Sequence, residues 1–203
     1  HVVILPIYRD ADERAKVLPY CESLKAELAA QTYDDEPIRV RIDDRDLRGG
    51  EKKWQWVKRG VPLRVEVGPR DIAEEKVMIG RRDVAGKGQS LPRTEFVATA
   101  AAMLTAMQQA LFDKAENARQ DASVRIDNLK EFEAFFTPKN EERPEIHGGL
   151  AYSHFVDSPA MDETLKRLKA SIRCIPLDAP QEPGKCIFTG RPSTKRGVFA
   201  KAY

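Results

Sequence analysis

Residues 2–8 read Val-Val-Ile-Leu-Pro-Ile-Tyr, and this stretch decides the fold class. A continuous apolar and β-branched run of this length is typical of a strand that is buried on both faces, as the strands of parallel sheets are. Asp10 follows at a position that suits a helix N-cap, and Glu13 lies three residues later. This spacing resembles a capping box and predicts a helix that runs to about residue 30.

The next segments continue the alternation of strand and helix. Residues 38–43 predict a second strand, 49–59 a second helix, and 61–67 a third strand whose apolar residues alternate with Arg64 and Glu66. Strands that alternate with helices predict a βαβαβ unit with a parallel sheet and right-handed crossovers. Residues 68–71, Gly-Pro-Arg-Asp, predict a turn after the third strand.

The remainder of the chain predicts a second, smaller domain. Two more strands are expected at 76–82 and 90–93, followed by a helix from Glu95 whose helical character continues through residue 136. Residues 137–144 have the composition of a linker. Beyond it we expect a helix at 160–169 and short strands at 171–176, 185–188 and 197–202.

Composition excludes several classes of protein. The chain has 203 residues, of which 41% are hydrophobic and 33% charged, so neither a disordered nor a fibrous protein is expected. No apolar stretch approaches the roughly 20 residues of a membrane-spanning helix. Three cysteines, Cys21, Cys174 and Cys186, are an odd number and predict no disulfide framework, which favours a reducing compartment, the cytoplasm.

The net charge of +2 is distributed unevenly along the chain. Residues 1–38 carry four basic and eight acidic side chains, whereas residues 39–82 carry thirteen basic and eight acidic ones. Residues 183–203 carry five basic side chains and no acidic one. Such asymmetry is typical of a surface that faces an anion, and a solvated face can also show it.

The sequence predicts no catalytic residue. His1, His147 and His154 are scattered without metal-ligand spacing, and no nucleophile or phosphate-loop motif follows a predicted strand. The cluster Asp43–Asp46 lies at the carboxyl end of a predicted parallel strand, where open α/β sheets bind ligands. Its carboxylates could bind magnesium, read RNA bases, or cap helices while paired with Arg45 and Arg48.

Trp54 and Trp56 are the two tryptophans of the chain, and both lie among basic residues on the predicted second helix. Residues at i and i+2 cannot share one helix face, so at least one indole should point away from the sheet. An exposed ring inside a basic rim suits single-stranded nucleic acid, because bases stack on rings while cations bind phosphates. The alternative is one core residue and one partly exposed packing residue.

Several segments together resemble the anticodon-binding and C-terminal domains of prolyl-tRNA synthetases of the archaeal and eukaryote-like type. The matching segments are VVILPIY at 2–8, IDDRD at 42–46, KRGVPLRVEVGPRD at 58–71, SIRCIP at 171–176, GKC at 184–186 and VFAKAY at 198–203. The resemblance implies a five-stranded mixed sheet flanked by helices, followed by a small α+β domain. We expect an anticodon-binding domain at 1–115, a helical connector and linker at 116–144, and the C-terminal domain at 145–203.

The resemblance also implies the function. The parent enzyme would use ATP and magnesium to ligate proline to tRNA(Pro), would be a homodimer, and would hold its catalytic domain in a part of the protein that precedes this chain. The chain would then be the C-terminal portion of that protein, would bind tRNA and the catalytic domain, and would be inactive alone. In relatives the terminal tyrosine, here Tyr203, reaches toward the catalytic domain.

Proline anticodons share two guanines, so the resemblance implies residues that read guanine. Arginine or lysine suits guanine O6 and N7, and a carboxylate can accept from guanine amino protons. The expected anticodon-binding residues are Asp44, Arg45, Lys53, Glu66 and Arg70, with Trp54 or Trp56 stacking on a base.

Many relatives hold zinc with four cysteines in the C-terminal domain. Here those positions fall near Phe155, Ala160 and Thr189, and Cys186 alone remains. A single thiolate does not hold structural zinc, so we expect no zinc and packing by Phe155 and Phe188 instead.

Two other functions stay open on the residues alone. One is a stand-alone α/β protein that binds a metal or small anion at Asp43–Asp46. The other is a non-catalytic interaction module, since a fold does not fix a role.

Overall fold

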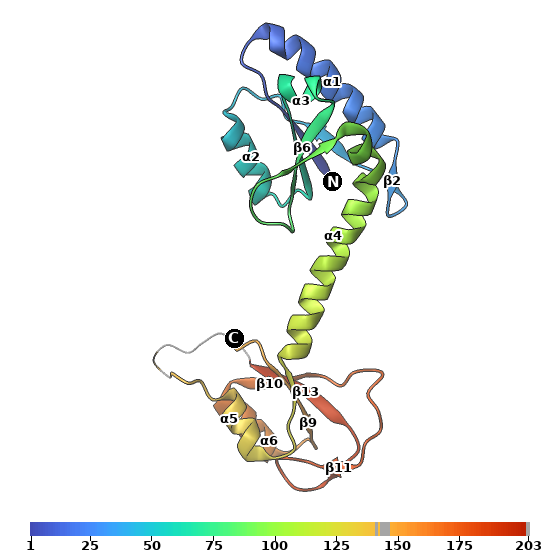
Figure 1. The fold of residues 1–203 in the computed structure, drawn as a ribbon. Coiled ribbons are helices and arrows are strands. Elements are labelled where there is room, and N and C mark those ends of the chain that lie inside the picture. The colour runs from blue at the N-terminus through green and yellow to red at the C-terminus, as the bar shows by residue number, and fades with distance from the viewer. Residues whose placement is uncertain (141, 143–146, 202–203) are drawn as a thin grey trace. The chain divides into compact units, whose positions relative to one another are not determined.

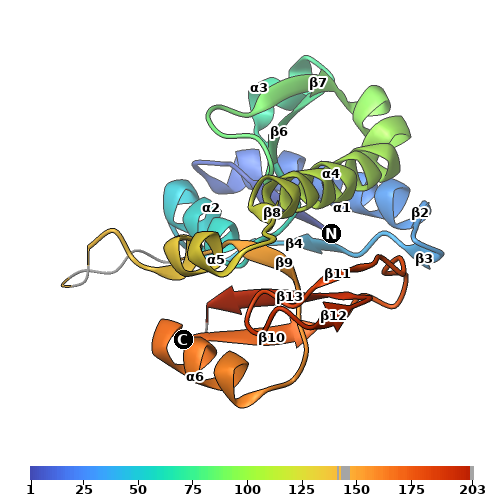
Figure 2. The same ribbon diagram turned by 90° about the horizontal axis from the view of Figure 1, so that it is seen from below.

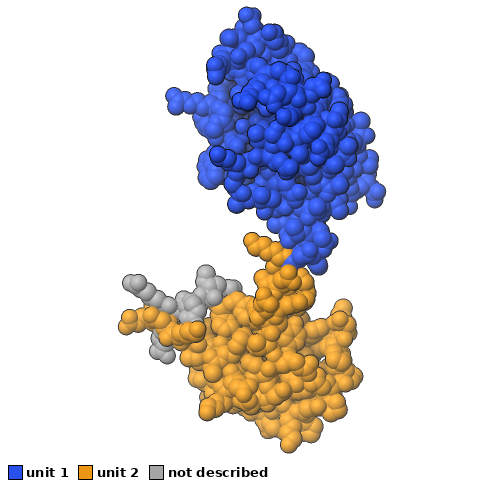
Figure 3. Space-filling view, in the orientation of Figure 1, with its two compact units in different colours: residues 1–113 blue, residues 114–203 orange. Residues whose placement is uncertain are grey.

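A computed structural model of the chain describes residues 1–140, 142 and 147–201. These residues form two compact units, 1–113 and 114–203, coloured separately in Figure 3. Tyr203 and part of the predicted linker lie outside the described residues. No helix of the described residues is long and apolar enough to cross a membrane.

The first unit is a mixed sheet with helices on both faces (Figure 1). Its helices are α1 (Ala11–Ala29), α2 (Gly49–Lys58), α3 (Pro69–Ala73) and most of α4 (Arg93–Asp121). Its sheet strands are β1 (Val2–Pro6), β4 (Val40–Ile42), β5 (Leu63–Val67), β6 (Lys76–Arg81) and β7 (Gln89–Pro92), and β2 (Thr32–Tyr33) pairs with β3 (Glu36–Pro37) as a separate hairpin.

The order of the five strands is β4-β1-β5-β6-β7. Strands β4 and β5 run parallel to β1, whereas β6 and β7 are antiparallel to their neighbours. The predicted βαβαβ unit and five-stranded mixed sheet are therefore confirmed. The carboxyl ends of β4, β1 and β5 meet at one edge, which we call the strand-end edge.

Alternate residues of β1 pack on opposite faces of the sheet. Helix α2 lies on one face and helices α1 and α4 lie on the other (Figures 1 and 2). Val2 and Ile4 pack with α1 and α4 in the main hydrophobic core. Val3 and Leu5 face the other way and pack with Trp56 of α2. Helix α2 thus covers the second face with a much smaller apolar cluster.

Helix starts at the strand-end edge follow local capping chemistry. The Asp10 side chain accepts a hydrogen bond from the Glu13 amide, as predicted, while the Glu13 carboxylate accepts from the Arg9 amide. The predicted turn at 68–71 instead begins helix α3, because Pro69 suits the first helical turn and the Asp71 carboxylate accepts from the Gly68 amide at 2.9 Å.

The second unit contains a four-stranded sheet of order β10-β13-β9-β8. Its strands are β8 (Ser123–Arg125), β9 (Leu150–His154), β10 (Ala170–Cys174), β11 (Gly184–Lys185), β12 (Pro192–Ser193) and β13 (Arg196–Lys201), of which β11 and β12 form a separate hairpin. Its helices are the end of α4, α5 (Leu129–Phe136) and α6 (Pro159–Leu168).

Strand β8 corrects the prediction of continuous helical character through residue 136. Helix α4 ends at Asp121, and β8 then pairs in parallel with β9 before α5 begins at Leu129. Backbone bonds from Leu150 to Ala122 and from Ile126 to Tyr152 fix the pairing at both ends.

Aromatic side chains build the core of the second unit. Phe132, Phe136 and Phe199 are fully buried. Phe155 and Phe188 each lie 5.9 Å from Phe199 between ring centroids, so both pack where the sequence analysis expected them.

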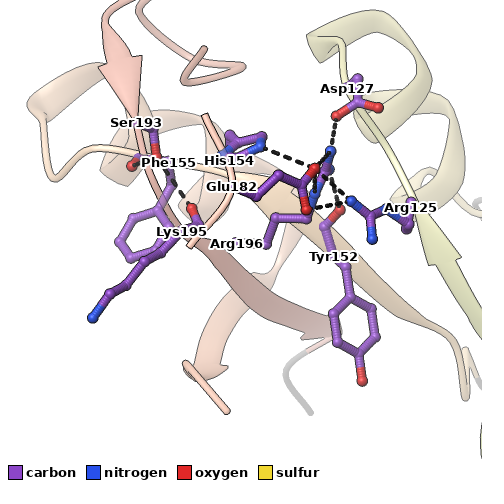
Figure 4. Close-up of polar contacts among 9 residues, drawn as sticks. All are labelled: Arg125, Asp127, Tyr152, His154, Phe155, Glu182, Ser193, Lys195 and Arg196. Carbon is purple, nitrogen blue, oxygen red and sulfur yellow. Dashed lines mark hydrogen bonds and ion pairs between the residues drawn. The ribbon is translucent and has the colours of Figure 1, made fainter. Parts of the chain in front are cut away.

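A polar cluster ties the segment before β11 to this sheet (Figure 4). The Glu182 carboxylate accepts from Arg125 and Arg196, which lowers its pKa to about 2. The ring of His154 is buried against Gly184, where a Cβ would stand 2.2 Å from His154 Nε2. Only glycine fits this approach.

Candidate nucleic-acid interface

The strand-end edge contains a hollow of about 450 Å³. Side chains of three kinds line it, namely apolar ones, the cations Arg9 and Arg70, and the carboxylates Glu13, Glu66 and Asp71. Two predicted anticodon-binding residues, Glu66 and Arg70, therefore share one surface. The hollow lies at the carboxyl ends of the parallel strands β1 and β5, where the chain leaves β1 for α1 and β5 for α3.

Asp43 organises the end of β4. Its side chain is 2% exposed and accepts from Arg45 through two bonds of 2.7 Å and from Trp56 Nε1 at 2.7 Å. The Arg45 guanidinium and the Trp56 donor hold the pKa of Asp43 well below its usual range, although burial opposes them. Arg45 remains 47% exposed, so part of its guanidinium can still meet a ligand.

Asp44 is held by partners that the sequence analysis did not identify. Tyr8 Oη donates to one carboxylate oxygen and Arg14 Nη2 to the other, each at 2.5 Å. Burial would raise the pKa of Asp44, but these two hydrogen bonds lower it below its ordinary value. The hydrogen bond to Asp44 in turn raises the pKa of Tyr8.

Lys53 and Glu66 form an ion pair of 2.6 Å from α2 to β5. Both side chains stay partly exposed, at 44% and 30%. Exposed pairs of this kind contribute about 0–1 kcal/mol, so a ligand could exchange partners with either group at little cost.

The two tryptophans divide as the helical spacing predicts. Trp56 is 7% exposed and packs on β1, whereas Trp54 is 60% exposed. Only Trp54 offers a free ring for stacking; Trp56 serves the core and the Asp43 carboxylate.

Arg70 projects from the first turn of α3. Its side chain is 91% exposed and meets Glu74 at 3.2 Å across one helical turn. This contact constrains Arg70 weakly, because an exposed i,i+4 pair is worth only about 0.3–0.5 kcal/mol. Of the predicted cations, Arg70 is the most accessible to a ligand.

The carboxylates at 43–46 do not form a metal centre. The carboxylate oxygens of Asp43 and Asp44 accept hydrogen bonds from arginine, tryptophan and tyrosine donors. Of the three aspartates, Asp46 alone is exposed. No group of three or more His, Cys, Asp or Glu side chains among the described residues could hold a metal ion.

Cys186 does not fit the four-cysteine zinc site of the resembling proteins. Burial would raise the pKa of its thiol, but hydrogen bonds from Thr189 and from the amides of Phe188, Thr189 and Val156 lower it. Hydrogen-bond donors of the protein therefore surround the sulfur, and Cys21, Cys174 and Cys186 are all free cysteines.

Two arginines of the first unit were not among the residues predicted from the sequence. Arg41 of β4 and Arg59 at the end of α2 both lie over the Trp56 ring. Their positions follow from pairing and packing across the sheet face, which spacing along the chain does not reveal.

Comparisons with protein families place two models on this chain. Residues 1–103 match the anticodon binding domain, and residues 141–203 match the prolyl-tRNA synthetase C-terminal domain. The first model covers the unit that carries the strand-end edge.

Curated relatives match the whole chain. Proteins named proline–tRNA ligase from Rhodopirellula baltica, Protochlamydia amoebophila and Akkermansia muciniphila are 49%, 47% and 40% identical to it, over 100% of its length. The matched region is 39% of the first relative and 40% of the other two. The chain therefore spans about two fifths of the length of these proteins.

Proposed function

The chain belongs to the anticodon-binding domain family, and from this premise we propose that it is the anticodon-recognising and C-terminal part of an enzyme that ligates proline to its tRNA. The observation that carries the proposal is the match of its entire length to proteins named proline–tRNA ligase. The strand-end edge supports it, because an exposed indole and accessible cations lie in the unit that matches the anticodon family.

The proposal gives each edge residue a role. Trp54 stacks on an unpaired base, since base–ring stacking is worth about 1–3 kcal/mol. Arg70 and Arg45 donate to guanine O6 and N7. Lys53, Glu66 and Asp44 complete the polar rim, with Glu66 accepting from guanine amino protons once Lys53 turns to a phosphate. Trp56 positions Arg45 through Asp43 and does not stack.

The proposal extends to the whole protein. Its substrates are proline, ATP with magnesium and tRNA(Pro), its partners are its own catalytic domain and a second copy, and its location is the cytoplasm. We keep the boundaries expected from the sequence, 1–115 for the anticodon-binding domain and 145–203 for the C-terminal domain, with 116–144 as a connector that adds β8 and α5 to the second unit. The proposal includes a second unit that folds without zinc, which is supported by the edge-to-face packing of Phe155 and Phe188 in its aromatic core. Alone, the chain forms no prolyl-adenylate, which a pyrophosphate-exchange assay checks.

Trp54→Ala provides the direct test of the RNA interface. We expect binding of a stem-loop RNA with a proline anticodon to weaken roughly 5- to 150-fold, as loss of one stacked base predicts. Phe112→Ala is the matched control, because Phe112 of α4 is an aromatic side chain that is 59% exposed, and its neighbour Leu111 lines a pocket with His1 at the opposite end of β1. Equal affinity of Trp54→Ala and the unchanged chain would contradict the interface.

Arg70→Ala separates base reading from phosphate contact. A base reader loses affinity for the cognate anticodon and discriminates less at one guanine, by about 1–3 kcal/mol. A phosphate contact loses affinity equally for all RNAs, which would remove Arg70 from the reading set.

A further inference from the structure

Arg41 and Arg59 converge on one indole without a carboxylate to neutralise them. The guanidinium carbon of Arg41 lies 5.6 Å from the centroid of the Trp56 ring, and that of Arg59 lies 4.9 Å away. Both distances are within the range of a cation–π contact. Among the described residues, no acidic group forms an ion pair with either arginine.

The two carboxylates on this side of the sheet, Asp43 and Glu66, have other partners. Asp43 touches the same indole through Trp56 Nε1, but its oxygens also accept both bonds from Arg45. Glu66, on the same face of the sheet as α2, is paired with Lys53. Two guanidinium groups therefore border one ring with their hydrogen-bond donors still open to solvent.

The elements hold this pair in place. Arg41 lies opposite Val3 in the register of β4 and β1, on the face that α2 covers. Arg59 is the C-cap residue of α2, whose Trp56 packs on Val3 and Leu5. Because the ring is buried and anchored at Nε1, the stacked guanidinium groups have a rigid support. The two guanidinium carbons are at most 10.5 Å apart, as their distances to the ring centroid require, so the like charges repel each other and a bound anion would offset that repulsion.

We propose that Arg41 and Arg59, stacked on Trp56, form a binding site for a phosphate group of the RNA backbone. The inference rests on the proposed function, which supplies the polyanion. Phosphate is the favoured ligand because arginine forks donate two parallel bonds to it. The ligand belongs to the same RNA whose bases meet the strand-end edge, to which the site is connected by the hydrogen bonds that Trp56 and Arg45 donate to Asp43.

The salt dependence of RNA binding tests the proposal. Arg41→Gln with Arg59→Gln should lower the slope of log affinity against log salt by about 0.7–0.9, which is the contribution of one phosphate contact. Discrimination between a proline anticodon and one with both guanines replaced should not change. Lys16→Gln with Lys114→Gln removes the same charge from exposed helix positions and should leave the slope nearly unchanged. Arg41→Lys with Arg59→Lys keeps the charge and should retain most of the slope.

The NMR signal of the Trp56 indole N–H distinguishes a phosphate of the RNA backbone from free inorganic phosphate. In a Trp54→Phe chain, Trp56 gives the single indole N–H signal. We expect the stem-loop RNA to shift this signal, and inorganic phosphate alone to shift it at much higher concentration. Neither shift should occur when Arg41→Gln and Arg59→Gln are added to this chain.

Three outcomes would overturn the site. They are an unchanged salt slope in the glutamine variant, a slope reduced equally in the lysine-pair control, and a signal that moves with inorganic phosphate but not with RNA. In each case retained anticodon discrimination would leave the proposed function standing. If the unchanged chain does not bind the RNA at all, the proposed function fails and takes this inference with it.

Discussion

At the scale of single residues, the strand-end edge depends on a carboxylate that never reaches the surface. Asp43 accepts from Arg45 and Trp56 while 2% exposed, so it fixes one cation of the edge and the indole beneath it. Removing one partner of a buried charge costs about 1–3 kcal/mol, because the remaining group loses a bond that water cannot replace.

Trp56→Phe tests this at the indole. The variant keeps an apolar ring but loses the Nε1 donor to Asp43, so we expect a loss of about 1–3 kcal/mol in the free energy of unfolding. Trp54→Phe should change it by less than about 0.5 kcal/mol, because that ring is largely exposed. Urea unfolding, followed by fluorescence of the remaining tryptophan, measures both. Equal losses would show that the Nε1 bond contributes nothing.

The pH dependence of stability tests the same carboxylate. The pKa of Asp43 is lower in the folded chain than its ordinary value, so its contribution is present above about pH 4 and is lost as the pH falls further. The Asp43→Asn variant should have a lower free energy of unfolding than the unchanged chain at pH 6, and this difference should be smaller at pH 3. The Asp46→Asn variant, changed at an exposed position, should differ little from the unchanged chain in free energy of unfolding at either pH. If the difference for Asp43→Asn is the same at both pH values, the lowered pKa of Asp43 is contradicted.

At the scale of elements, the alternation of strand and helix in residues 1–67 could be predicted because each signal is local. The apolar run at 2–8, the cap at Asp10 and the alternation around Arg64 each fit within a few residues. Strand β8 could not be predicted in this way. It has three residues, and its partner β9 begins 25 residues beyond its end, so the pairing is decided by long-range contacts.

The candidate site divides in the same manner. The i, i+2 spacing on a helix predicted that the two indoles point in different directions. The positions of the strand ends predicted where polar side chains lie close together. The pairing of Asp44 with Tyr8 and Arg14, and the two arginines on Trp56, depend on strands and helices meeting in three dimensions.

Fragment folding tests the contribution of β8 and α5 to the second unit. Ile126, Phe132 and Phe136 are buried in its core, and β8 completes its sheet. We expect residues 114–203 to fold alone and residues 145–203 to remain unfolded, as judged by dispersion of their NMR spectra. A dispersed spectrum from 145–203 would show that the C-terminal domain needs neither element.

At the scale of the whole molecule, the two units have different chemistry. The first has an exposed indole on α2 and accessible arginines after β4 and β5, while the second has an aromatic core and a cluster of ion pairs around Glu182. A net charge of only +2 makes general attraction to RNA weak, so specific binding has to come from where the cations lie.

The most direct measurement of the central claim compares two stem-loop RNAs that differ only in the anticodon. One carries the two guanines shared by proline anticodons, and the other has adenine at both positions. At a fixed salt concentration the chain should bind the first at least about tenfold more tightly, since each wrong base costs about 1–3 kcal/mol. Equal affinity for the two RNAs would contradict anticodon reading by this chain.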